Sequence, residues 1–127
     1  MLVPINLAQA TTGAVVSFVP VPFACRLVSI TLVGNITLAA NGTNHLTITV
    51  KAADGATALA SRTTNSGGGA GGTTLTAGTV EGLAITNFDD SGLTANQAYK
   101  IETAVGGTLA NATDFTLVFE FEAARSV

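Results

Sequence analysis

Strict alternation of apolar and polar positions dominates three segments of the chain. Residues 46–51 read Leu-Thr-Ile-Thr-Val-Lys, and the same period of two recurs over residues 98–105 and 115–122. Because successive side chains of a β-strand point to opposite faces of a sheet, each segment predicts a strand with one apolar and one polar face. A capped helical period is absent, and residues 93–98 hold at most a short turn. The pattern therefore predicts an all-β protein.

Turn-forming pairs separate the predicted strands at short intervals. Asn41-Gly42, Asp54-Gly55 and Gly106-Gly107 supply the positive φ angles that tight turns between antiparallel strands require. Many short strands without amphipathic helices between them favour a β-sandwich or jelly roll over a doubly wound α/β fold. We therefore expect one domain over residues 14–127, a jelly-roll-like antiparallel β-sandwich.

The first thirteen residues are predicted to form an extended N-terminal arm, residues 1–13. The sequence Ala8-Gln9-Ala10 imitates a signal-peptidase site, but no basic residue precedes it, and Pro4 and Asn6 break the apolar stretch. We expect the arm to become ordered on binding a partner, so that its deletion leaves the fold intact. Without a secretion signal, the single thiol of Cys25 fits synthesis in a reducing cytoplasm.

The N-terminal part of the domain is apolar on both strand faces. Residues 15–23 and 27–33 place aliphatic and aromatic side chains at odd and even positions alike, and Arg26 is the only charged residue before Lys51. Such strands are either central in a core or covered by another chain, and we favour a covering chain. Pro20 and Pro22 cannot donate to a sheet ladder, so this segment fits an edge strand, a bend between sheets or an extended contact segment. An interface and a sandwich corner within one subunit both stay open for it. The candidate subunit or partner interface consists of Leu2, Val3, Pro4, Ile5, Val15, Phe18, Val19, Pro20, Val21, Pro22, Phe23, Leu27 and Val33.

The amino-acid composition favours binding to other protein chains over a catalytic function. Only 10% of the 127 residues are charged, against roughly 25% in a typical soluble domain. The mean hydropathy is +0.50, yet no apolar run reaches the ~18 residues of a membrane helix, so we expect no membrane partner. A net charge of −3 with five scattered basic residues argues against nucleic-acid binding, which needs a basic patch.

Candidate chemical sites are weak, and we predict no catalytic residue, no metal, no cofactor and no enzymatic activity. Cys25 lies in an apolar strand start, and His45 has no second histidine with which to share a metal. Residues 87–92 read like the front of an EF-hand loop, but Ala98 stands where the bidentate glutamate is needed. The glycine-rich residues 67–72 lack the lysine of a phosphate-binding loop.

A family resemblance joins these observations. Residues 12–23 (TGAVVSFVPVPF), the aliphatic strand 27–34 with Asn35-Ile36-Thr37, and the closing segment 93–101 (LTANQAYKI) resemble the small jelly-roll head decoration, or cement, proteins of tailed bacteriophages. The resemblance implies a structural virion protein on the capsid exterior, made in the host cytoplasm. It would bind the major capsid protein and bridge adjacent subunits. It would also associate with itself, as a homotrimer in preference to a dimer.

A second function stays open at this point. A fibre or pilus-type adhesin subunit is also rich in Thr, Ala and Gly, and it would use its N-terminal segment for strand addition to a neighbour.

Overall fold

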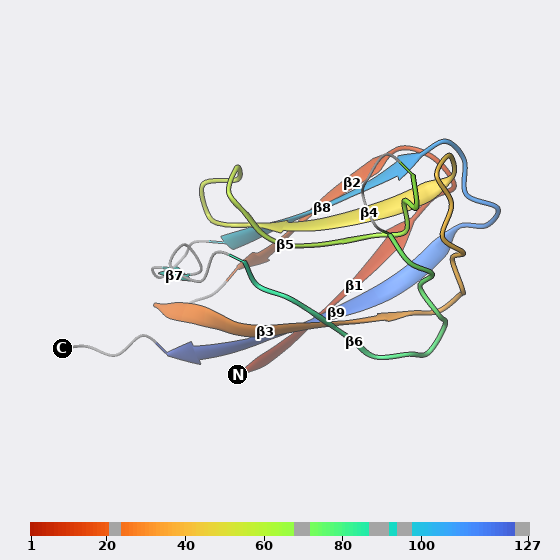
Figure 1. The fold of residues 1–127 in the computed structure, drawn as a ribbon. Helices are drawn as coiled ribbons and strands as arrows, with labels where there is room; N and C mark the ends of the chain where they lie inside the picture. Colours follow the sequence, from red (N-terminus) through yellow and green to blue (C-terminus); the bar gives the residue numbers. More distant parts are fainter. Residues whose placement is uncertain (21–23, 68–71, 87–91, 94–97, 124–127) are drawn as a thin grey trace.

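The computed structural model describes residues 1–20, 24–67, 72–86, 92–93 and 98–123, and these form β-strands joined by turns and loops (Figure 1). The strands are β1 (Leu2–Gln9), β2 (Ala14–Pro20), β3 (Cys25–Gly34), β4 (His45–Lys51), β5 (Ala58–Thr63), β6 (Glu81–Leu83), β7 (Gly92–Leu93), β8 (Ala98–Gly106) and β9 (Thr113–Ala123). Across these ranges there is no helix with the length and apolarity needed to cross a membrane.

The strands form two antiparallel sheets, seen as a lower and an upper layer in Figure 1. The lower sheet has the order β1-β9-β3-β6, with the short β7 also paired to β3, and the upper sheet has the order β2-β8-β4-β5. The pairing is nested, because β1 pairs with β9, β2 with β8, β3 with β6 and β4 with β5. A long antiparallel ribbon rolled into two packed sheets gives this order, which is that of a jelly roll. The predicted fold class is therefore confirmed.

The predicted alternation holds in the strands that form the core. In β9, Phe115, Leu117, Phe119 and Phe121 are buried, and the residues between them are more exposed. The ring of Phe121 stacks on Tyr99 of the opposite sheet, with centroids 5.7 Å apart. Burial raises the pKa of the Tyr99 hydroxyl, which keeps this core group neutral.

A β-bulge explains why the sequence of β3 is apolar at both odd and even positions. The register with β9 shifts between Leu27 and Ser29, so Val28 is an extra residue on this strand. Cys25 and Leu27 before the bulge, and Ile30 and Leu32 after it, therefore bury on the same face. The interpretation of β3 as a two-sided strand covered by another chain is wrong. Leu27 is 1% exposed and belongs to the core, not to an interface.

The segment expected to be an arm is an integral strand. β1 pairs with β9 from Leu2↔Glu120 to Gln9↔Thr113, and Leu7 and Gln9 are buried. The Oε1 atom of Gln9 accepts a hydrogen bond from the Thr103 hydroxyl of the other sheet at 2.5 Å. The expectation of a separate arm is therefore corrected, because this segment supplies the outer strand of its own sheet.

The turn chemistry behaves as predicted at the β4–β5 connection. Gly55 has a φ of 72°, and Asp54 Oδ1 accepts hydrogen bonds from the backbone amides of Ala56 and Thr57. The Thr57 hydroxyl also donates to Asp54 Oδ2. These three hydrogen bonds lower the pKa of Asp54 to about 2, and the bond from the Thr57 hydroxyl has the largest effect.

Candidate functional site

The edge strands β1 and β2 carry most of the exposed large apolar side chains of the described residues. Four of the six such residues, Met1, Leu2, Val16 and Phe18, belong to these strands or the residue before them; the others are Val28 and Val80. Leu2 is 65% exposed and Phe18 is 56% exposed. Each strand is the outermost member of its sheet, and the two follow each other in the chain. We take the β1–β2 side as the candidate interaction surface.

The two faces of β2 are both apolar, as the sequence predicts, but they have different surroundings. Val19 is fully buried in the core, and Val15 is half-buried on the same inner face. Val16 and Phe18 project from the outer face, where they are exposed. The prediction that Val19 belongs to an interface is therefore wrong, whereas the exposed side chain of Phe18 can contact a partner. Val16 is missing from the predicted interface, although it has the same parity as Phe18 and the alternation could have revealed it.

The backbone of β2 leaves half of its polar groups facing away from β8. The Val105 amide donates to the Gly13 carbonyl at 2.9 Å, which fixes the odd-numbered residues as those that bond to β8. The backbone groups of Ala14, Val16, Phe18 and Pro20 therefore point to the free edge. Pro20 lacks an N–H at a position that would not have bonded to β8, so it costs no ladder bond.

The free edge of β1 is interrupted by a proline near its start. Met1 and Phe121 bond to each other through both their amino and carbonyl groups, so Leu2, Pro4, Asn6 and Ala8 point their backbone away from β9. Pro4 removes a donor from this edge without weakening the β1–β9 ladder, and a proline on an edge discourages pairing with another strand. Of the predicted interface residues on β1, Leu2 and Pro4 are exposed, and Val3 and Ile5 pack partly on the core.

Charged groups on the outer face lie next to the exposed apolar pair of β2. In the β2–β8 register Val16 is opposite Glu102 and Phe18 is opposite Lys100. Glu102 accepts from Lys100 Nζ at 2.8 Å and from Lys51 Nζ at 2.7 Å, and these bonds lower the pKa of its carboxyl group. Two further pairs, Arg26–Glu122 and Arg62–Glu81, engage the remaining Lys and Arg side chains of the described ranges. Within those ranges, every Lys and Arg side chain is thus matched by a carboxylate.

A groove with a volume of about 450 Å³ lies on the lower sheet, next to β1. Asn6 Oδ1 in this groove accepts a hydrogen bond from the Thr116 hydroxyl at 2.7 Å. The lining residues are Asn6, Leu7, Ala8, Val33, Gly34, Asn35, Asp114, Phe115 and Thr116. Val33, half-buried in β3, is the one predicted interface residue that this groove includes. A second hollow, of about 510 Å³, lies between the loops that contain Asn41, Asn44 and Thr108.

The remaining chemical candidates do not come together. Burial raises the pKa of the Cys25 thiol, which favours its neutral form. His45 lies at the start of β4 against Gly106, its partner in β8. The structure, in the part that it describes, holds no group of three or more His, Cys, Asp or Glu side chains able to bind a metal. Most of the EF-hand-like segment, residues 87–91, and the predicted interface residues Val21, Pro22 and Phe23 lie outside the described residues.

No family model, curated protein or solved structure matches this chain.

Proposed function

We propose that this protein is a structural virion component that binds the exterior of an assembled phage capsid and stabilises it by bridging major capsid subunits. The observation that carries the proposal is the exposed apolar groups on β1 and β2, in a chain with few charges. Leaving Leu2, Val16 and Phe18 in water is costly, by about 1.5–3 kcal/mol for a fully exposed side chain relative to a buried one. A partner that covers them recovers part of that free energy.

Bridging stabilises a shell by simple linkage. A protein that binds only the assembled lattice shifts the assembly equilibrium toward that lattice, by an amount set by its affinity and concentration. The jelly roll suits this task because β1 and β2 are each paired along their whole length with a strand of their own sheet. The proposed contact with the shell lies on the outer face of the lower sheet, at Leu2, Pro4 and the groove beside Asn6.

The alternative of a strand-adding adhesin subunit is less well supported. In strand addition, a segment of one subunit completes the sheet of its neighbour. Here β1 already completes its own sheet along its full length, and Pro4 interrupts its free edge. Because β1 is already paired with β9 of its own chain, it is not free to add to the sheet of a neighbouring subunit.

Binding to capsids tests the proposal directly. The full chain would be mixed with DNA-free shells assembled from the major capsid protein of the phage proposed as its source, and separately with unassembled subunits of the same capsid protein. We expect saturable co-sedimentation with the shells only, and regular added density on their outer surface by electron microscopy. Absence of binding to the shells, or equal binding to free subunits, would contradict the proposed function.

A matched pair of variants locates the contact. Leu2→Ser removes an exposed apolar side chain from β1, and Val80→Ser removes one that is 67% exposed and lies before β6. We expect Leu2→Ser to weaken shell binding about tenfold and Val80→Ser to leave it unchanged. Equal losses in the two variants would argue against a contact centred on β1.

A further inference from the structure

The edge of β2 differs from the edge of β1 in one respect that decides what can pair with it. From Ala14 to Phe18 no proline interrupts the outward N–H and C=O groups, and Pro20 stands only at the end of the strand. Val16 and Phe18 lie on the same stretch and are about half exposed. An unprotected apolar edge of this kind is a template for another strand.

The outward N–H and C=O groups of β2 match those of a second copy of β2. When two copies of β2 run antiparallel with Ala14 opposite Pro20, all residues of the strand overlap, and Ser17 faces Ser17 at the centre. Val16 and Phe18 of one copy then form hydrogen-bonded pairs with Phe18 and Val16 of the other. The Ala14 amide donates to the Pro20 carbonyl of the second copy. Proline thus lies at the end of the paired stretch, where its missing N–H costs only a terminal bond.

The side chains agree with this register. On the outer face, Val16 of one copy lies beside Phe18 of the other, so each covers one flank of its neighbour. Because Val16 is opposite Glu102 and Phe18 is opposite Lys100 in β8, each apolar pair has a carboxylate on one flank and an ammonium group on the other. No like charges meet across the junction, and the surface is complementary to itself, as a two-fold interface requires.

We propose that two copies of this chain associate through β2, in antiparallel register about a two-fold axis at Ser17, to form a continuous sheet across the dimer. This two-fold pairing replaces the homotrimer that the family resemblance implies. This association is a property of the chain alone and does not rest on the proposed function. A chain that dimerises but binds no shell would keep this inference and lose the proposed function. A monomer that binds shells would do the reverse.

Sedimentation equilibrium of the full chain over a concentration series tests the proposal. We expect a monomer–dimer equilibrium that Val16→Pro weakens at least about tenfold, since it removes an outward donor from each copy and no bond to β8. Ala8→Pro is the matched control, because it removes an outward donor from β1, and it should leave the equilibrium unchanged. A monomer at all concentrations, a trimer, or equal effects of the two prolines would overturn the proposal.

Cysteine cross-linking tests the register without depending on the stability of a proline variant. Opposite residues in a non-hydrogen-bonded antiparallel pair have Cα atoms about 4.5 Å apart, which a disulfide can span. We therefore expect Ser17→Cys to give a disulfide-linked dimer under mild oxidation. Val15→Cys, whose counterpart across the axis is Val19, should give little. The native Cys25 is 1% exposed and serves as an internal background. Preferential cross-linking of Val15→Cys, or none in either variant, would overturn the register.

Discussion

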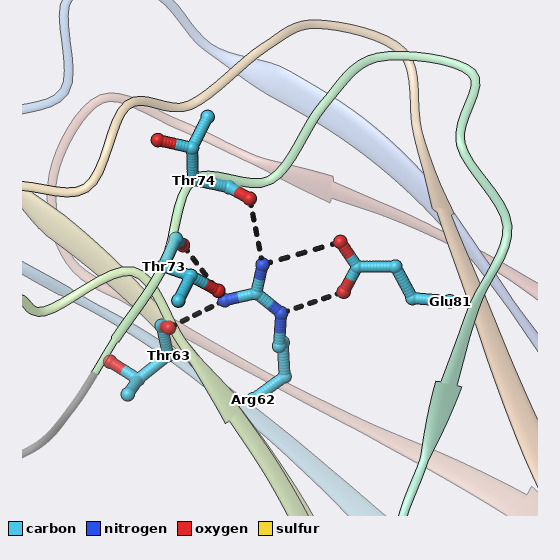
Figure 2. A network of polar contacts seen from close by, with 5 residues as sticks. All are labelled: Arg62, Thr63, Thr73, Thr74 and Glu81. Carbon is cyan, nitrogen blue, oxygen red and sulfur yellow. Dashed lines mark hydrogen bonds and ion pairs between the residues drawn. The ribbon is translucent and has the colours of Figure 1, made fainter.

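The guanidinium group of Arg62 on β5 donates two hydrogen bonds to the carboxylate of Glu81 on β6, from Nε to Oε2 at 2.8 Å and from Nη2 to Oε1 at 3.3 Å. The same guanidinium donates to the carbonyl oxygens of Thr63, Thr73 and Thr74, as Figure 2 shows. Because β5 and β6 are edge strands of different sheets, this network ties the two layers together on one side. The opposite side, formed by β1 and β2, keeps edges that are free in the single chain. Side-chain hydrogen bonds thus link the two sheets at the β5–β6 side, whereas the β1–β2 side has strand edges to which another chain can bind.

Removal of the Arg62 guanidinium should destabilise the fold strongly. Its side chain is only 13% exposed, so Arg62→Met leaves the Glu81 carboxylate and the three threonine carbonyl groups without this donor. We expect the free energy of unfolding to fall by about 2–4 kcal/mol. Arg26→Met is the control, because the Arg26–Glu122 pair is largely exposed and should contribute less than about 1 kcal/mol. Urea denaturation of both variants measures the difference, and equal small losses would show that Arg62 does not fasten the layers.

A methyl group at Gly106 should be poorly tolerated. Gly106 lies opposite His45, and a Cβ atom there would overlap the imidazole ring. We expect Gly106→Ala to cost about 1–3 kcal/mol, the usual range for overpacking. A methyl group at Gly82 on β6 would meet no atom within 4 Å, so Gly82→Ala should be neutral or stabilise by about 0.5 kcal/mol. Thermal unfolding compares the two, and similar midpoints would mean that the His45 ring moves aside freely.

The depressed pKa of Asp54 predicts a loss of stability in acid. The pKa of about 2 in the folded protein lies below its ordinary value of 3.8, so the folded state favours the ionised carboxylate. Its stabilising effect is therefore present above pH 4 and is lost as the pH falls from 4 through 2. Thr57→Val removes the hydroxyl donor, and we expect the pKa of Asp54 to rise toward 3.8 while the two backbone donors keep it below that value.

Titration of the Asp54 carboxyl resonance by NMR measures this change. Thr116→Val is the matched control, because its hydroxyl donates to Asn6 within the lower sheet and should not affect Asp54, which follows a strand of the upper sheet. An unchanged pKa of Asp54 in Thr57→Val would show that the hydroxyl does not hold the carboxylate.

Local patterns predicted the parts of the fold that local chemistry controls. The alternation in residues 46–51, 98–105 and 115–122 reappears as β4, β8 and β9, because period two and strand geometry are the same constraint. The Asp54-Gly55 turn follows from the positive φ of its glycine. The shared parity of Phe18 and Pro20 on an edge strand also follows from their spacing of two residues.

Features set by distant strands could not be read from local patterns. The bulge at Val28 is visible only against the register of β9, so the change of parity in β3 looked like two apolar faces. β1, whose apolar positions are interrupted by Pro4 and Asn6, owes its structure to β9, more than a hundred residues later in the chain, and no local signal marks that pairing. The core positions of Val19 and Leu27 follow from the same packing of distant strands.

Deletion of β1 should damage the fold, which reverses the expectation of a dispensable arm. Without residues 1–9, the outer edge of β9 loses its partner strand, and the Thr103 hydroxyl loses the buried Gln9 acceptor that joins the two sheets. We expect the truncated chain to lose cooperative urea unfolding or to fall in stability by at least about 3 kcal/mol. Leu2→Ser, a change on the exposed face of the same strand, should stay within about 0.5 kcal/mol of the parent. A truncated chain with the full unfolding free energy would show that β1 only rests on a sandwich complete without it.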